Sequence, residues 1–216
     1  MLGCAGHPLV KTPHLDALAK RGTRFNRACT NCPICVPARA SPATGRYVHD
    51  IGYWDNTIAY DGLIKSWGHR LQEAGIRVES IGKLHYRHEE DPTGFDRQHL
   101  PMHIKDGIGM IHMSVRKPFP DFAPPSPKPG SGAAGIVLEA GPGESEYTRF
   151  DRKVAELASD WLINRADSEE PWALFVSFVT PHYPLLVLEE LFALFPIDAM
   201  PMPRLGQQTS FEHHPW

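Results

Sequence analysis

Three cysteines spaced three residues apart mark the most chemically informative stretch of this 216-residue sequence, CTNCPICVPARASPATGR at positions 29–46. Cys29, Cys32 and Cys35 are followed by Arg39, one helical turn beyond the last thiol. Thiols at this spacing are typical of metal or cluster ligation, of disulfide exchange, or of a cysteine that acts as a nucleophile. The residues around the cysteines distinguish these three hypotheses.

The metal and redox hypotheses both leave the pattern incomplete. The spacing matches the first three ligands of a bacterial ferredoxin run, but arginine stands where the fourth cysteine belongs, and Cys4 lies far upstream. A structural zinc site needs a second paired half, which the sequence lacks. CPIC has the form of a glutaredoxin motif, yet that motif follows the first strand of a small βαβ unit. We therefore favour a nucleophilic Cys35 and expect Cys29 and Cys32 to be incidental, buried thiols.

A nucleophilic Cys35 has two sources of activation nearby. Pro37 and the alanine-rich residues after it predict a helix that ends at Gly45, with Pro42 as a kink, so Cys35 lies at the positive end of this helix. Arg39 follows by one turn and shares a helical face with Cys35. The helix end and the guanidinium both favour an anionic group here, and the guanidinium also suits an oxyanion substrate.

Composition and charge exclude several classes of function. The chain is 42% hydrophobic and 22% charged with a formal net charge of −3, which argues against a nucleic-acid partner. The best apolar run, Trp172–Val179, is too short for a membrane span of about 20 residues. The start, MLGCAG, is similar to a lipoprotein cleavage box but has no apolar segment before Cys4. We therefore expect no membrane association and a chain that is cytoplasmic as it stands, or one that has lost a leader.

The hydrophobic pattern alternates between helices and strands. Helices are predicted at 13–21, 37–44, 62–74, 148–166 and 188–195 from their apolar periodicity and their caps. Strands are predicted at 23–30, 76–83 and 171–179, the last as a run buried on both faces. Two helices show a clear apolar face, formed by Leu63, Ile64, Trp67 and Leu71 in one and by Phe150, Val154, Leu157, Trp161 and Leu162 in the other. Together these elements predict an α/β fold with a mostly parallel sheet flanked by helices.

We expect a single domain over residues 1–216, because a chain of this length suits one substantial core. Prolines and glycines are dense at 118–143. They predict a long irregular excursion within the domain and not a linker between folded halves.

Residues 35–46 resemble the signature of the sulfatases, which is Cys-x-Pro-Ser/Ala-Arg followed after a short spacer by Thr-Gly-Arg. Further segments are similar to that family in the family's order: residues 7–25, IGKLHY at 81–86 with GFD at 94–96, and FVSFVTPHYP at 175–184. The resemblance implies an alkaline-phosphatase-like fold, incomplete at both ends. The signature is specific because many positions agree at fixed spacing, namely Cys35, Pro37, Ala38, Arg39, Thr44, Gly45 and Arg46.

The resemblance implies covalent catalysis at Cys35. In sulfatases a separate formylglycine-generating enzyme oxidises this cysteine to formylglycine, an aldehyde that hydrates to a geminal diol. One hydroxyl attacks the sulfur of a sulfate ester and the alcohol leaves; the second hydroxyl then expels sulfate and restores the aldehyde. By resemblance, Arg39 steadies the diol, and Lys83 and His182 bind sulfate oxygens. His85 takes the proton from the diol as sulfate is eliminated.

The resemblance also implies a divalent cation, commonly calcium, with the group derived from Cys35 as one ligand. The family's first strand supplies adjacent aspartates as further ligands, and this sequence has no Asp-Asp pair. Calcium takes about six to eight oxygen ligands, and Cys35 is the one position that the resemblance carries over. We therefore expect an N-terminal sulfatase portion, truncated at both ends, that binds the cation poorly and is impaired or inactive as it stands.

Several alternatives stay open. The implied substrate is a sulfate-ester small molecule or glycan, but relatives with the same nucleophile motif act on phosphonate or phosphate esters. A non-catalytic remnant that retains only the scaffold is a third hypothesis. Taken singly, Lys83, His85 and His182 are more often solvated side chains than site residues, so the functional hypothesis depends on their combination.

Overall fold

The computed structural model describes residues 2–109 and 139–202, which divide into two compact units. As far as they are described, unit 1 takes in Met1–Asn26, Gly141–Gly143 and Val187–Trp216, and unit 2 takes in Arg27–Ala140 and Glu144–Leu186. All five predicted site residues belong to unit 2. The single domain over 1–216 stays a prediction, and most of the predicted excursion at 118–143 lies outside the described residues.

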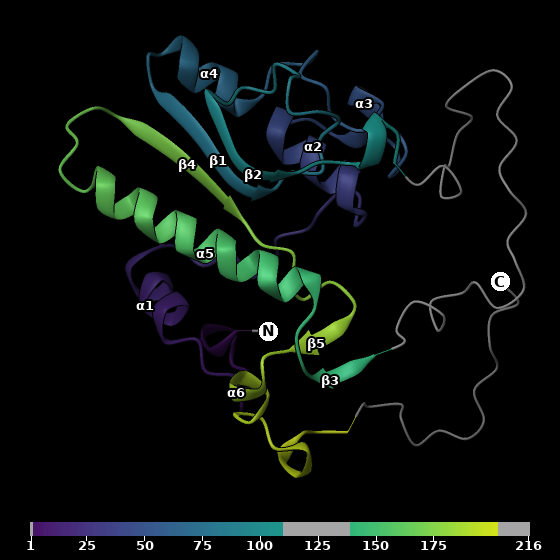
Figure 1. Cartoon of the computed structure of the whole chain (residues 1–216), viewed down its shortest axis with the longest axis vertical. Helices are drawn as coiled ribbons and strands as arrows, with labels where there is room; N and C mark the ends of the chain where they lie inside the picture. Colours follow the sequence, from purple (N-terminus) through teal and green to yellow (C-terminus); the bar gives the residue numbers. More distant parts are fainter. Residues whose placement is uncertain (1, 110–138, 203–216) are drawn as a thin grey trace, which may run out of the picture. The chain divides into compact units, whose positions relative to one another are not determined.

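A three-stranded parallel sheet forms the centre of unit 2 (Figure 1). The middle strand β1 (Arg77–Lys83) pairs with β2 (Arg97–Met102) on one side and with β4 (Trp172–Ser177) on the other. Gly82 lies opposite Ser177, so the carboxyl ends of β1 and β4 meet at one edge. The predicted parallel sheet is confirmed, and β1 and β4 match the strands expected at 76–83 and 171–179. The sequence of β2, RQHLPM, lacks alternation and was not predicted.

Helix α5 (Glu146–Arg165) packs on one face of the sheet, as Figure 1 shows. The Ser145 hydroxyl caps it by accepting the backbone N–H of Thr148 at 3.2 Å. Leu162 was predicted on the buried face but is exposed. It directly follows Trp161 of the interface, and each residue advances about 100° around a helix, so the two side chains point in different directions. The interface is formed by Phe150, Val154, Leu157, Ala158 and Trp161 of the helix with Ile81, Leu174 and Val176 of the strands.

Helices α2 (Cys35–Thr44) and α4 (Trp67–Glu73) cover the other face (Figure 1). Phe175 points to this side because successive side chains of a strand alternate between faces, and its ring packs against Trp67. The helix predicted at 62–74 is shorter than expected: the Ser66 side chain caps it, and Leu63 before the cap is 85% exposed. The buried cluster on this face comprises Ala40, Ala43, Ile51, Tyr53, Tyr60, Leu84 and Tyr86.

The remaining elements are short. The predicted helix 13–21 is confirmed as α1 (Pro13–Arg21), whereas residues 23–30 form no strand. That prediction was wrong because Phe25 and Ala28 are three residues apart, which does not fit a period of two, and Phe25 is exposed. The helix predicted at 188–195 shortens to α6 (Glu189–Phe192). The other elements are α3 (Val48–Ile51), the paired strands β3 (Ala140–Pro142) and β5 (Leu185–Val187), and the 3-10 turns Gly3–Ala5, Lys105–Gly107 and Ile197–Ala199.

A buried carboxylate joins α5 to the sheet. Glu79 of β1 is 2% exposed and accepts a hydrogen bond from Trp161 Nε1 at 2.9 Å. Its carboxylate also contacts His99 Nε2 at 2.6 Å and pairs with Arg77 and Arg165. Burial alone would raise the pKa of Glu79, but the hydrogen bonds from His99, Trp161 and Arg77 lower this pKa to about 2. Glu79 is therefore held as a charged group in the interface between helix and sheet.

Among the described residues, 2–109 and 139–202, no helix combines the length and the apolar character that crossing a bilayer requires.

The close approach of β1 and β4 predicts that Gly82→Ala destabilises the protein strongly. Gly82 has φ +97°, and an added Cβ would lie 2.2 Å from the backbone oxygen of Ser177. We expect a loss of about 3 kcal/mol in the free energy of unfolding, measured by urea denaturation. Gly75→Ala is the matched control, because Gly75 has φ +76° but open space around its Cβ position, and should cost about 1 kcal/mol. Equal losses in the two variants would contradict the β1–β4 packing.

Candidate functional site

Arg39 lies against the carboxyl ends of two parallel strands. Lys83 is the last residue of β1, and Ser177 is the last residue of β4. Arg39 Nη1 donates to the backbone oxygen of Lys83 at 2.9 Å and to Ser177 Oγ at 3.1 Å. Parallel sheets present their ligand sites at this edge, so Arg39 is positioned at the expected place in the fold.

Cys35 is the first residue of α2, two residues earlier than the predicted helix start at Pro37. The helix ends as predicted at Gly45, which adopts the left-handed conformation, and Pro42 is tolerated inside it. One free N–H at the helix start is satisfied from outside, because the backbone N–H of Val36 donates to Asn56 Oδ1 at 2.9 Å. Cys35 is thus placed at the positive end of a ten-residue helix.

Arg39 and Lys83 are partly stripped of solvent beside Cys35. Lys83 is 4% exposed, and burial lowers the pKa of both its ammonium and the Arg39 guanidinium. A negative charge at Cys35 acts on both groups and opposes this lowering. The three side chains therefore form one electrostatic cluster, with two cations within reach of the charge at Cys35.

His85 follows β1 and completes the cluster from the next loop. Its backbone has φ +52°, a conformation that few non-glycine residues adopt. Burial, together with the positive charges of Lys83 and Arg39, lowers the pKa of His85 to about 3, and His182 adds to this effect. The Nδ1 atom of His85 is buried and has no hydrogen-bond partner among the described residues. His85 is therefore a neutral imidazole with an unsatisfied ring nitrogen inside a cationic site.

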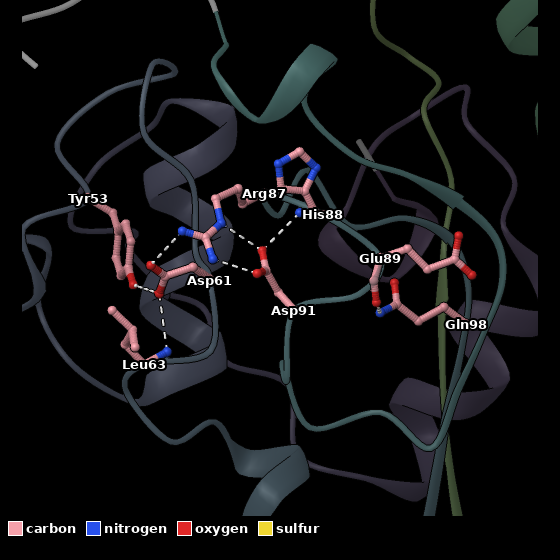
Figure 2. A network of polar contacts seen from close by, with 8 residues as sticks. All are labelled: Tyr53, Asp61, Leu63, Arg87, His88, Glu89, Asp91 and Gln98. Atoms are coloured by element: carbon pink, nitrogen blue, oxygen red, sulfur yellow. Dashed lines mark hydrogen bonds and ion pairs between the residues drawn. The ribbon is translucent and has the colours of Figure 1, made fainter.

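The loop after β1 is held in place by an ion-pair network around Arg87 (Figure 2). The Arg87 side chain lies between Asp61 and Asp91, with Nε to Asp91 Oδ2 at 2.8 Å and Nη1 to Asp61 Oδ2 at 3.3 Å. Tyr53 Oη donates to Asp61 Oδ1 at 2.7 Å, and the backbone N–H of Arg87 donates to the Tyr60 carbonyl at 2.9 Å. These contacts fix the chain two residues after His85 and so limit the motion of that ring.

His182 approaches the cluster from the segment after β4. Its Nδ1 atom lies 2.8 Å from the Tyr183 carbonyl oxygen. A carbonyl can only accept, so Nδ1 carries the proton and Nε2 is the free nitrogen of the neutral ring. Tyr147 packs edge-on against the His182 ring with centroids 5.6 Å apart. The structure thus brings Cys35 and the four residues predicted with it into one region.

Asp151 and Ser177 belong to the same region and were not predicted. Asp151 of α5 accepts the backbone N–H groups of Val179 at 2.7 Å and Thr180 at 2.8 Å, and also the Thr180 hydroxyl. A signal for it was present, because Asp151 falls three residues before Val154 and so occupies the apolar face of the helix. A charged residue on a buried face indicates a specific partner. Ser177 had no such signal.

A cavity of about 450 Å³ opens beside Cys35. Its wall includes Cys35 at the start of α2 and Phe175 of β4. Phe175 pairs in register with Ser80, which lies in the middle of β1, so the cavity reaches the central part of the sheet. Its lining is mainly apolar and includes Cys35, Arg39, Trp67, Leu84, Tyr86 and Phe175.

The described residues do not fit a divalent cation. Within 2–109 and 139–202, no group of three or more histidine, cysteine or acidic side chains is placed to hold a metal ion. Arg39 and Lys83 present positive charge to Cys35, and the Asp151 carboxylate already accepts three hydrogen bonds. Cys35 as a metal ligand therefore stays a prediction, and any cation site would need ligands beyond the residues described.

The two outer cysteines of the cluster are not buried as expected. Cys29 is exposed, Cys32 is half-buried, and all four cysteines are free thiols. The expectation was wrong for Cys29, since residues 23–30 form no strand, and Cys32 is only partly covered. Within the described part of the chain, the cysteines do not belong to a group of three or more side chains placed to hold a metal ion, so the iron–sulfur alternative gains no support.

The buried neutral state of His85 predicts a specific loss of stability in acid. In the unfolded chain this ring protonates near pH 6.5, whereas in the folded protein it protonates only near pH 3. The unfolded state therefore binds the extra proton as the pH falls through this window, and folding stability falls by up to about 1.4 kcal/mol per pH unit. His85→Gln should remove this contribution in urea denaturation series at several pH values. The exposed His49→Gln serves as control, and an unchanged acid slope in His85→Gln would contradict the buried site.

Comparison with known proteins gives two sets of relatives. A profile of the sulfatase family matches residues 1–196. Choline-sulfatase of Rhizobium meliloti (strain 1021) is 30% identical over 191 residues, covering 85% of this chain and 36% of the relative. The uncharacterized sulfatase YidJ of Escherichia coli (strain K12) is 30% identical over 192 residues with the same coverage. The chain thus spans about a third of the length of these curated relatives.

Solved structures agree with the fold. One was determined in complex with its substrate D-glucosamine-2-N,6-O-disulfate, with a TM-score of 0.63 at 22% identity over 94% of this chain and 36% of that one. The phosphonate monoester hydrolase of Agrobacterium radiobacter gives a TM-score of 0.62 at 22% identity, over 93% of this chain and 42% of that one. These similarities support the parallel sheet with flanking helices. The family is shown by the profile that covers residues 1–196: this protein belongs to the sulfatase family.

Proposed function

We propose that the chain carries part of a sulfuric ester hydrolase site in which Cys35, converted to formylglycine, is the nucleophile. The observation that carries this proposal is the charge of the site. Two cations, the half-buried Arg39 and the buried Lys83, lie within electrostatic reach of Cys35, and the acidic group near them, Asp151, has its oxygens occupied. Such a site favours an oxyanion over a cation or a neutral ligand.

Formylglycine, when present, supplies a covalent nucleophile that can be regenerated after each transfer. Cys35 suits this group because the start of α2 favours negative charge there. Arg39, fixed by two hydrogen bonds from one nitrogen, keeps its remaining N–H groups for the nucleophile and for an oxyanion. Lys83 neutralises the charge that grows on sulfate oxygens, and its burial strengthens this attraction.

The two histidines have different roles in the proposed reaction. His85 is neutral in a cationic surrounding and offers a buried, unpartnered nitrogen as a proton acceptor. A bound sulfate group brings negative charge close to Lys83 and Arg39, which raises the proton affinity of His85 when the proton must be taken. His182 has its Nδ1 proton engaged with Tyr183, so its Nε2 binds a sulfate oxygen only as the protonated ring.

The substrate class follows from the relatives. One relative is named for choline sulfate, and one solved structure holds a disulfated glucosamine. We infer a sulfate ester of a small alcohol or of a sugar. The similarity to a phosphonate monoester hydrolase concerns the fold, so a phosphonate or phosphate ester is the alternative that an assay must test.

A divalent cation and formylglycine are general features of the family. The described residues lack the acidic ligands for it. Because the chain spans about a third of the curated relatives, full turnover by these residues alone is expected to be impaired.

Conversion of Cys35 is the first prediction of the proposed function. Co-expression with a formylglycine-generating enzyme should produce an aldehyde on Cys35, detected by mass spectrometry. Trypsin releases residues 28–39 as one peptide that contains Cys29, Cys32 and Cys35, so fragment ions are needed to locate the change. Cys35→Ser should abolish the aldehyde, and Cys32→Ser should leave it unchanged. An aldehyde at Cys32, or an unmodified peptide beside a converted control peptide, would refute the proposal.

The converted chain also separates the substrate alternatives. Hydrolysis of 4-nitrophenyl sulfate above the level of Cys35→Ser supports the sulfatase assignment. Faster hydrolysis of a 4-nitrophenyl phosphonate supports the phosphonate alternative. No turnover of either ester, with or without added calcium, supports a non-catalytic remnant.

A further inference from the structure

We propose that Asp151 of α5 is a positioning residue that holds the segment after β4 and thereby keeps His182 near His85. This inference rests on the proposed function for the role of His182, but the contacts that carry it are structural.

Asp151 holds the chain after β4 by three hydrogen bonds, an arrangement that we call the clamp. The residue is 9% exposed and lies in the second turn of α5. Its Oδ1 accepts the backbone N–H of Val179, and its Oδ2 accepts both the backbone N–H and the hydroxyl of Thr180. Hydrogen bonds to an ionised carboxylate are stronger than those between neutral groups. The chain leaving β4 is therefore fixed by one side chain from the helix behind the sheet.

The clamp is connected directly to His182. The backbone N–H of His182 donates to the Val179 carbonyl at 3.1 Å, so His182 is one hydrogen bond away from a residue that Asp151 holds. The His182 ring is then fixed by its own contacts with Tyr183 and Tyr147. Movement of Val179 would carry the histidine with it.

Asp151 also acts on the other side of the site. Its negative charge favours the protonated form of Lys83 and opposes the effect of burial on that pKa. Ser177, which accepts from Arg39, lies two residues before Val179 on the same segment. One carboxylate thus supports both an anion-binding lysine and the backbone that leads from Ser177 to His182.

An amide cannot replace this carboxylate. Asparagine has one oxygen, and its NH₂ group would face the Thr180 N–H or the Val179 N–H, donor against donor. Asp151→Asn therefore tests the clamp with almost no change in volume. Asp160→Asn is the matched control, because Asp160 is an exposed residue of the same helix.

The experiment uses the full chain, residues 1–216, and three measurements by NMR. Asp151→Asn should lower the hydrogen-exchange protection of the Val179 and Thr180 amides by about tenfold or more, since each loses a charge-assisted hydrogen bond. The ring signals of His182 should shift, and the dissociation constant for inorganic sulfate should rise by about tenfold. Asp160→Asn should match the wild type in all three measurements.

Thr180→Val is a second test in case Asp151→Asn does not fold. It removes the hydroxyl that donates to Asp151 and leaves both backbone hydrogen bonds to that carboxylate. Its His182 signals should shift in the same direction by a smaller amount. Unchanged His182 signals and sulfate affinity in a folded Asp151→Asn, or unchanged His182 signals in Thr180→Val, would reduce Asp151 to a structural residue and overturn the inference. If the wild-type chain does not bind sulfate, the proposed function fails, and the His182 signals still decide the role of Asp151.

Discussion

The site of this protein depends on one half-buried guanidinium. Arg39 extends from α2 to the carboxyl ends of β1 and β4 and hydrogen-bonds to Lys83 and Ser177 through a single nitrogen. These two acceptors come from neighbouring strands and are separated by nearly a hundred residues of chain. The arginine therefore joins a helix and two strands at the point where Cys35 begins its helix. Together with the hydrogen bond from Val36 to Asn56 and the packing of Ala40 and Ala43, it positions Cys35 relative to the sheet edge.

Partial burial of the Arg39 guanidinium costs free energy. An anionic ligand would offset part of that cost. Arg39 and Lys83 both lie in places where burial disfavours their charge, and His85 stays neutral beside them. Three acidic groups of unit 2 are already paired: Glu79 with Arg77 and His99, Asp91 with Arg87, and Asp151 with backbone amides. The charges of Arg39 and Lys83 are thus only partly compensated, and a sulfate group would neutralise them further.

The elements that position the site were largely predictable, and their errors have physical causes. The strands at 76–83 and 171–179 and the helix at 148–166 are dominated by local apolar patterns, so they were recognised correctly. The strand expected at 23–30 depended on two apolar residues out of register, and β2 has a polar edge-strand sequence without alternation. The helix expected from residue 62 begins only at Trp67, because the cap at Ser66 outweighs the apolar residues before it.

The sequence alone revealed a cysteine with a guanidinium one turn later, in a motif specific enough to predict the sulfatase family. It also predicted the parallel sheet, from the alternation of helices with strands such as the apolar run of β4, although β1 contains Arg77, Glu79 and Lys83. The charges near Cys35, the low pKa of His85 and the hydrogen bonds from Val179 and Thr180 to Asp151 became visible only in the folded structure. Those properties depend on burial and on contacts between residues far apart in the chain, and local sequence patterns carry no information about either.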